Sequence, residues 1–362
     1  MNTELFKEFQ EEIKSRILEY LPPEYEQARV EVRTMEKNNG LQLQGLCILK
    51  EGEHITPNIY LENFFEEWSS QKLTMEEVLN QIAKIQMYHE HRVSFDASLV
   101  TDLEKVKENI VGRLVNGEYN AKRLQNLPHT SFEDLAMTYH IHVVSGEIEG
   151  SVEVTNQMLK EYGMDVKELH ELAMGNMERM YPLSFDSMEN IMKNILKSQM
   201  MEEGMEAARA ETVAGEMVSQ VQNEFNLYVI SNEDNLYGAA ALFYPGVQEM
   251  LAEKMGGDYV VLPSSLHEVL ILKAEPHLDL EAMQEMVKEV NLTQVAAKDK
   301  LSDHIYVYDA KERGLFRAGQ KTEREEKRNV NFQEKLKEKK AESKAMGQVA
   351  VKTDKKKREV CL

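Results

Sequence analysis

The sequence predicts an α+β fold, because short pairs of strands alternate with amphipathic helices and do not follow a regular strand-helix-strand order. Two kinds of pattern support this prediction. Apolar residues recur at spacings of three and four in several segments, which is typical of helices, and alternate with polar residues in others, which is typical of strands. Turn and helix-capping residues separate these segments.

The first 90 residues predict a helix, a β-hairpin and a second helix. Pro22-Pro23 ends the first helix, and Asn38-Asn39-Gly40 supplies a turn between alternating segments over 28–47. A third strand is expected over 55–60. Thr74 and Glu77 have the spacing of a capping box, which predicts a helix that continues to about residue 89.

The middle of the chain predicts a helix over 102–111, a strand within 132–144 and another over 152–154. Asp165 and Glu168 form a second capping box, so we expect a helix that ends before Pro182. Residues 184–222 are rich in methionine and favour helices, with few large apolar residues over 202–214. This stretch is predicted to be a helical connection between two lobes, 1–183 and 223–317. Methionine is a common gap-filler in cores but also suits an adaptable binding groove.

The last third predicts strands over 227–230, 259–262, 267–272 and 305–308. Pro245 and Gly256-Gly257 bracket a helix, and another is expected over 278–290. Residues 318–362 form a lysine-rich tail that is expected to be either disordered or helical.

Charge divides the chain unevenly. Of 43 basic and 63 acidic residues, 14 and 8 lie in 320–362, so the tail carries +6 and the preceding 319 residues carry −26. An acidic body repels nucleic acid and anionic membranes over most of its surface, so only the tail is expected to attract them. No apolar stretch is long enough for a membrane span, and Cys47 and Cys361 do not suggest a disulfide framework. These features predict a cytoplasmic protein, whose oligomeric state they leave open.

Several separated motifs occur in order along the chain. They are Lys37-Asn38-Asn39-Gly40, Arg113-Leu114-Val115-Asn116, Thr155-Asn156-Gln157-Met158-Leu159, Glu168-Leu169-His170-Glu171-Leu172-Ala173, Leu262-Pro263-Ser264-Ser265-Leu266-His267-Glu268-Val269 and Leu301-Ser302-Asp303-His304. Together they resemble those of a bacterial family of unknown function, associated with anaerobic Gram-positive bacteria. The resemblance covers roughly residues 1–315, and a weaker one over about 152–273 links the chain to a second uncharacterised bacterial family. It implies one coherent unit of bacterial origin and names no catalytic residue, substrate or cofactor.

Two H-x-H pairs are the first chemical candidates. His140 and His142 are two apart in a predicted strand, so they face the same way and could hold one divalent metal ion. Equally, the alternation could place them on the wetter face of a half-buried strand, with Met137, Tyr139, Ile141 and Val143 inside. His89 and His91 form the other pair, and a histidine at the end of an apolar helix stripe more often has a structural role.

Ser264, Ser265, His267 and Glu268 bring a nucleophile, a base and a carboxylate close together in sequence. A catalytic triad also needs mutual hydrogen bonds, and Pro-Ser-Ser between strands is ordinary turn chemistry. The segment Gly314 to Thr322 nearly matches a phosphate loop, but Lys321 and Thr322 are displaced by one position.

In the tail, Lys355, Lys356, Lys357 and Arg358 form a basic cluster that could contact phosphates without sequence preference. A solvated extension without a dedicated partner is the other interpretation. Because no complete catalytic motif occurs, the sequence favours a non-catalytic protein that acts through contacts with another protein. The alternatives are a hydrolase or metal-dependent enzyme that uses histidine and carboxylate groups, and association of the tail with nucleic acid.

Overall fold

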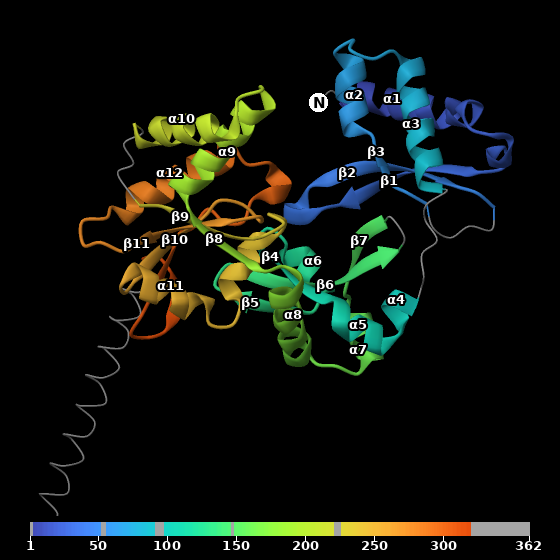
Figure 1. Cartoon of the computed structure of the whole chain (residues 1–362). Helices are drawn as coiled ribbons and strands as arrows, with labels where there is room; N and C mark the ends of the chain where they lie inside the picture. Colours follow the sequence, from blue (N-terminus) through green and yellow to red (C-terminus); the bar gives the residue numbers. More distant parts are fainter. Residues whose placement is uncertain (1–2, 52–55, 91–97, 146–147, 221–225, 320–362) are drawn as a thin grey trace, which may run out of the picture.

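The chain folds into three antiparallel sheets, each covered by helices, as the computed structural model in Figure 1 shows. The structure describes residues 3–51, 56–90, 98–145, 148–220 and 226–319. The predicted α+β class is confirmed. The second H-x-H pair, at His89 and His91, and the tail from residue 320 onward lie outside the residues whose side chains the structure describes.

The N-terminal unit packs three helices on one face of a small sheet (Figure 1). The predicted hairpin is confirmed, and so is the capping box, in which Thr74 and Glu77 exchange backbone-to-side-chain hydrogen bonds. Phe6, Phe9, Ile13 and Ile17 are all buried. The elements are α1 (Thr3–Arg16), η1 (Ile17–Tyr20), η2 (Pro23–Tyr25), β1 (Arg29–Glu36), η3 (Asn38–Gly40), β2 (Gln42–Leu49), β3 (Ile59–Tyr60), α2 (Glu62–Ser69) and α3 (Met75–Glu90).

The middle sheet is built around one long strand, β6, which pairs with β4 along one edge and with β5 and β7 along the other. The helix predicted over 102–111 ends at Asn109, because Ile110 and Val111 already belong to the buried strand β4. The elements are α4 (Ser98–Thr101), α5 (Leu103–Asn109), β4 (Ile110–Asn116), α6 (Ala121–Leu124), β5 (His129–Phe132), β6 (Leu135–Ser145), β7 (Ile148–Glu153), α7 (Asn156–Tyr162) and α8 (Val166–Met180), which begins with the predicted capping box.

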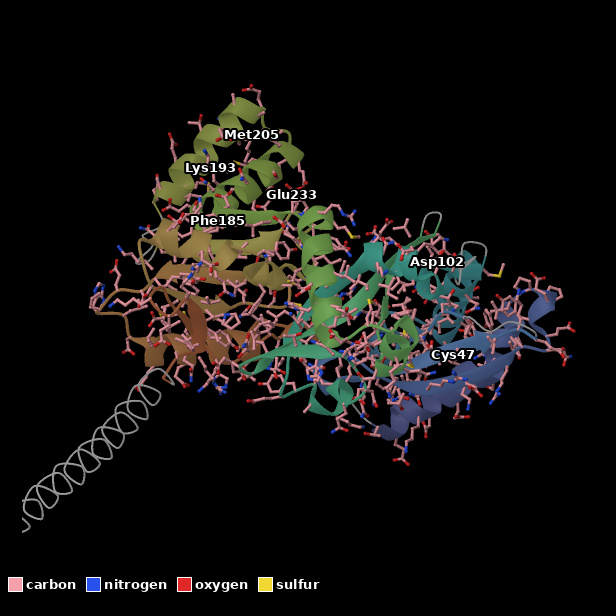
Figure 2. All side chains as sticks on the ribbon, turned by 90° about the horizontal axis from the view of Figure 1, so that it is seen from below. Cys47, Asp102, Phe185, Lys193, Met205 and Glu233 are labelled. Atoms are coloured by element: carbon pink, nitrogen blue, oxygen red, sulfur yellow. The ribbon has the colours of Figure 1, made fainter. Side chains whose placement is uncertain are left out.

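The largest sheet has the order β13-β12-β10-β11-β9-β8. Its edge strand β8 directly precedes the methionine-rich helices α9 and α10, which project from this sheet as a hairpin marked by Lys193 and Met205 in Figure 2. The elements are β8 (Leu183–Ser187), α9 (Met188–Glu202), α10 (Ala207–Ser219), β9 (Tyr228–Asn232), η4 (Gly238–Phe243), α11 (Val247–Met255), β10 (Tyr259–Pro263), β11 (Val269–Lys273), α12 (Leu280–Thr293), η5 (Ala297–Asp299), β12 (Tyr306–Asp309) and β13 (Gly314–Arg317).

One hydrophobic cluster joins the middle sheet to the large sheet. Its residues range in the sequence from Val106 to Tyr308, and they include residues of η4, α8 and α11. The opposite face of the large sheet packs on α12 through a separate cluster that contains Met283 and Val287. The cluster of the N-terminal unit shares no residue with either. The core thus continues on both sides of residues 184–222, and the predicted lobe boundaries stay a prediction.

A buried carboxylate also links the two larger sheets. Asp134, in the turn between β5 and β6, accepts hydrogen bonds from Ser302 Oγ at 2.6 Å and from Tyr306 OH at 2.7 Å. Asp134 is only 5% exposed and Ser302 is fully buried. Within the described ranges, no helix combines the length and the apolar character that a membrane span requires.

Candidate functional site

The most chemically distinctive cavity lies where the N-terminal unit meets the rest of the chain. We call it the junction pocket, and its volume is about 540 Å³. Its walls come from the end of β1, the turn after it, β3, the polar face of the middle sheet, the loop before η4, the β10–β11 turn and η5. The lining residues are Glu36, Lys37, Asn38, Leu43, Tyr60, Arg113, Val115, Arg123, His140, Glu153, Tyr237, Leu266, Lys298 and Asp299.

Arg113 is the central charged group of the junction pocket. It lies on β4 opposite Thr138 of β6, and its guanidinium carbon is 3.8 Å from the centroid of the Tyr237 ring. Its Nη2 donates a hydrogen bond to Ser151 Oγ at 2.7 Å. Within the described part of the chain, no carboxylate forms an ion pair with this guanidinium. Burial lowers the pKa of Arg113, although an arginine stays charged at neutral pH.

The other cations of the pocket differ in how they are paired. Arg123 forms an ion pair with Glu153, and Lys298 forms one with the neighbouring Asp299 at 3.0 Å. Lys37, in contrast, has its ammonium 4.5 Å from the centroid of the Tyr60 ring, and among the residues described it has no carboxylate partner. The pocket therefore holds two cations, Lys37 and Arg113, that form no ion pair among the described residues.

Tyr237 is held under Arg113 by an unusual backbone. Its φ of 55° lies in the left-handed region, which costs free energy in a residue other than glycine. Its N–H donates to Nδ1 of His267 at 3.2 Å, and the rings of Tyr237 and His267 lie 5.6 Å apart. His267 is thus a positioning residue for the aromatic wall of the pocket.

The four candidate catalytic residues form a turn between β10 and β11. Ser264 Oγ donates to Glu268 Oε1 at 3.2 Å, and Ser265 Oγ accepts from the backbone N–H of His267 at 3.1 Å. Neither serine hydroxyl is hydrogen-bonded to the imidazole, whose Nε2 lies 3.6 Å from Asp299. The second strand begins at Val269, so His267 and Glu268 belong to the turn and not to the strand predicted over 267–272. As arranged, the turn braces Tyr237 and does not form a triad.

His140 and His142 do face the same side of β6, but their partners differ. His140 is 5% exposed and lies in the junction pocket, where its Nε2 is 3.2 Å from Thr138 Oγ1 and 4.0 Å from Glu153. His142 is hydrogen-bonded to the hydroxyl of Tyr181 at 3.0 Å and lies 3.6 Å from Glu149. In the described ranges, no group of three or more His, Cys, Asp or Glu side chains is arranged so that it could hold a metal ion. A metal bound by this pair stays a prediction.

The sequence pattern allowed His140 to lie on the more solvent-exposed face of its strand, whereas the structure buries it. Burial lowers its pKa well below the ordinary value, and the nearby positive charges of Arg113 and Arg123 lower it further. The imidazole is therefore neutral at physiological pH. It therefore lines the pocket as a polar, uncharged group, and Lys37 and Arg113 stay the two cations without an ion pair among the described residues.

We expect the low pKa of His140 to make the protein less stable in mild acid. Below the unfolded pKa of about 6.5 the unfolded chain takes up a proton that the folded chain refuses, so the free energy of unfolding falls by up to ~1.4 kcal/mol per pH unit. His140→Gln should flatten this loss in urea denaturation between pH 7 and pH 5, whereas His277→Gln, at an exposed histidine, should not. Equal slopes for the wild type and His140→Gln would contradict the assignment.

Four motifs that carry the family resemblance meet at this junction. Asn39 donates to the carbonyls of Ala297 and Lys300, and its backbone N–H donates to Asn120 Oδ1 at 3.0 Å. Asn38 donates to the carbonyl of Lys298 at 2.7 Å, whereas its own Oδ1 is buried without a hydrogen-bond partner among the described residues. These bonds anchor the β1–β2 turn on η5.

Two further motifs complete the anchor. Asn116, three residues after Arg113, donates to the carbonyl of Leu301 at 3.0 Å and accepts from the N–H of Tyr119. Ser302 supplies the bond to Asp134 described above. The motifs over 37–40, 113–116, 262–269 and 301–304 therefore build one polar junction, although they are far apart in the sequence.

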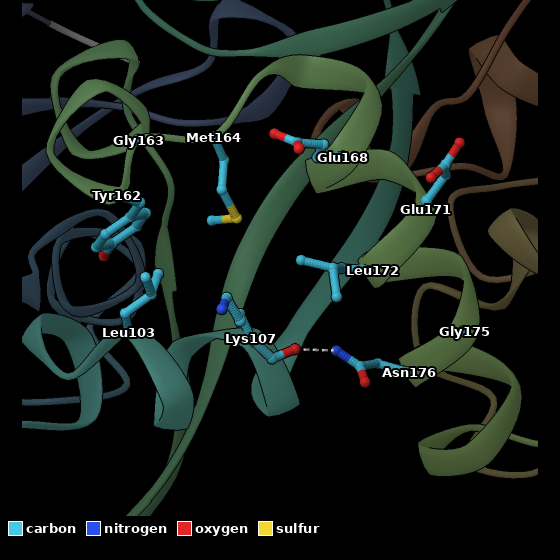
Figure 3. Close-up of a pocket in the computed structure, with 10 residues that line it drawn as sticks. All are labelled: Leu103, Lys107, Tyr162, Gly163, Met164, Glu168, Glu171, Leu172, Gly175 and Asn176. Atoms are coloured by element: carbon cyan, nitrogen blue, oxygen red, sulfur yellow. Dashed lines mark hydrogen bonds between the residues drawn. The ribbon is translucent and has the colours of Figure 1, made fainter.

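A second hollow lies between α5, α7 and α8 and has a volume of about 670 Å³. Figure 3 shows Met164 and Leu172 projecting into it, with the amide of Asn176 bonded to the carbonyl of Lys107 at 2.7 Å. Its polar groups serve the local structure, because Asn176 also donates to Ile110 and Glu168 caps α8. The hollow therefore offers a ligand fewer polar groups that are not already used by the local structure than the junction pocket does.

Sequence reasoning did not assign roles to Lys37, Arg113 or Tyr237. A signal existed for Arg113, because it is the one charged residue of an otherwise uncharged strand over 110–116. The near-match to a phosphate loop begins in β13, where Gly314 to Arg317 pair with β12, and its Lys321 and Thr322 lie outside the described residues. The cluster from Lys355 to Arg358 lies outside them too.

Comparison with known proteins identifies the family of the chain. A family model described as a family of unknown function (DUF5688) matches residues 6–310, which is most of the chain and includes every residue of the junction pocket. No curated protein matches the chain. No solved structure matches it either.

Proposed function

This chain belongs to the DUF5688 family of unknown function, so we propose a role from its site. We propose that it is a non-catalytic accessory protein that binds a small anionic molecule in the junction pocket. Arg113 carries the proposal. A partly buried guanidinium has five donors in a fixed fork, and here one side-chain hydroxyl and one aromatic ring are its contacts. A carboxylate or phosphate could accept two of the remaining hydrogen bonds.

The surroundings of Arg113 favour an organic anion over a bare inorganic ion. Leu43, Val115 and Leu266 give the pocket apolar wall, and the Tyr237 ring holds the guanidinium in place. A volume of about 540 Å³ is within the usual range of small-molecule sites, which combine apolar walls with a few fixed polar groups. The charge of the pocket also contrasts with that of residues 1–319, which carry −26.

Arg113→Met should weaken anion binding roughly 10- to 100-fold, because a charge-assisted hydrogen bond is worth about 1.5–3 kcal/mol. The affinities of acetate, succinate and inorganic phosphate would be measured by isothermal titration calorimetry in an anion-poor buffer. Arg209→Met, at an exposed arginine of α10, is the matched control and should bind like the wild type. Unchanged affinity in Arg113→Met would overturn the proposal.

The hydrolase alternative makes a different demand on the site. It needs Ser264 or Ser265 to exchange a proton with His267, whereas each hydroxyl is bonded within its own turn and Nδ1 of His267 accepts from Tyr237. Hydrolysis of an ester that is lost in Ser264→Ala but retained in Arg113→Met would favour the enzyme over the binding protein.

The cellular setting is part of the same proposal. Its further components are a bacterial cytoplasm and a protein partner that responds to the bound anion, and contact of the tail with nucleic acid is an alternative function. Deletion of residues 320–362 tests the contact of the tail with nucleic acid. Salt-sensitive binding to nucleic acid that survives the deletion would contradict a role for Lys355 to Arg358.

A further inference from the structure

Lys37 and Arg113, the two cations of the junction pocket without an ion pair among the described residues, belong to different structural units. Lys37 follows β1 in the N-terminal unit, whose core ends with α3, whereas Arg113 lies on β4 beside the core of the middle and large sheets. Each cation is placed over an aromatic ring of its own unit, Lys37 over Tyr60 and Arg113 over Tyr237. The pocket therefore presents one positive charge on each side of the junction.

The contacts that join the units around the pocket are polar. The β1–β2 turn is held by hydrogen bonds from Asn38 and Asn39 to the carbonyls of residues 297, 298 and 300, and Lys122 lies 3.6 Å from Glu36. The two hydrophobic clusters share no residue. Polar contacts at an exposed or part-buried surface contribute little free energy each, so a ligand that contacts both units can add substantially to their association.

From these observations we infer that the ligand is a small molecule with an anionic group at each end, one bound by Arg113 and the other by Lys37, and that it fastens the N-terminal unit to the rest of the protein. The inference rests on the proposed function and goes further, because it assigns a second anionic group of the ligand to Lys37, on the other side of the junction. Carboxylates and phosphates share the required chemistry, and the experiment distinguishes them.

The test compares molecules with one and two anionic groups. Acetate, succinate and adipate form the carboxylate series, and inorganic phosphate, pyrophosphate and methylenebisphosphonate form the phosphate series. We call a probe with two anionic groups doubly anionic and its counterpart with one anionic group singly anionic. At least one doubly anionic probe should bind the wild type about tenfold or more tightly than its singly anionic counterpart, since ~1.4 kcal/mol from a second charged contact corresponds to tenfold. The series that contains this probe identifies the class of ligand.

Two substitutions assign the two ends. Lys37→Met should reduce the affinity of the doubly anionic probe to that of its singly anionic counterpart and leave the counterpart unchanged, whereas Arg113→Met should weaken both. Lys84→Met, at an exposed lysine of α3, is the matched control and should change neither. Hydrogen exchange should also slow at residues 38–40 and 297–299 together when the doubly anionic probe binds.

The outcomes separate this inference from the proposed function. If Arg113→Met weakens binding but Lys37→Met does not, the pocket holds a single anion and the bridging inference is wrong while the proposed function stands. If neither substitution weakens binding, both are wrong. Slower exchange at 297–299 without any change at 38–40 would also contradict the bridge.

Discussion

Gly238→Ala is expected to destabilise the protein by at least ~3 kcal/mol, because it overpacks a site where the surrounding backbone cannot yield. A methyl group at this position would lie 2.2 Å from Ser231 Oγ, 2.6 Å from the backbone nitrogen of Asn232 and 2.6 Å from the carbonyl oxygen of His267. Gly238 directly follows Tyr237, so any shift that relieves the clash also moves the aromatic wall of the junction pocket.

Urea denaturation followed by circular dichroism measures this effect. Gly175→Ala is the matched control, since no atom lies within 4 Å of the added methyl group and alanine favours the interior of α8. The control should be neutral or stabilising by up to about 1 kcal/mol. A Gly238→Ala variant as stable as the wild type would show that the close approach of η4 to β9 and the β10–β11 turn is wrong.

Asp134→Ala should cost about 2–4 kcal/mol, because it leaves two buried hydroxyl groups without their acceptor. Ser302 Oγ and Tyr306 OH both donate to the carboxylate, and these bonds connect the middle sheet to β12 of the large sheet. The pKa of Tyr306 is raised, chiefly by burial and further by the negative charge of Asp134, so its hydroxyl stays a donor at neutral pH.

Two further variants sharpen this test. Asp134→Asn keeps one acceptor oxygen and should lose less stability than Asp134→Ala. Asp234→Ala removes an exposed carboxylate and should change the free energy of unfolding by less than about 0.5 kcal/mol. If Asp134→Ala and Asp234→Ala unfold at the same urea concentration, the buried linkage does not hold the sheets together.

Much of the fold could be predicted because its signals are local. The hairpin around Asn38-Asn39-Gly40 and the capping boxes at Thr74 and Asp165 depend on residues a few positions apart, and the structure contains all three. The missed elements depend on distant partners. Strand β8 is stabilised by β9, some 45 residues further along, and β4 by β6, so neither was evident from its own short segment.

The site was harder to predict for the same reason. His267 was singled out as a base beside two serines, whereas its ring nitrogen supports the backbone of Tyr237, thirty residues earlier. Lys37 and Arg113 were within recognised motifs, but spacing alone does not reveal that each lies over an aromatic ring and forms no ion pair with a carboxylate among the described residues. His140 was identified, and its position beside Arg113 depends on the register of β4 with β6.

The most direct test of anion binding in the junction pocket is a crystal structure of protein soaked in selenate. The anomalous scattering of the selenium atom shows where each selenate ion binds. In the wild type we predict a selenate ion within hydrogen-bonding distance of the Arg113 guanidinium, and we predict that this ion is missing from crystals of Arg113→Met treated identically. Selenate ions found on the exterior of wild-type crystals, with none at Arg113, would contradict the central claim.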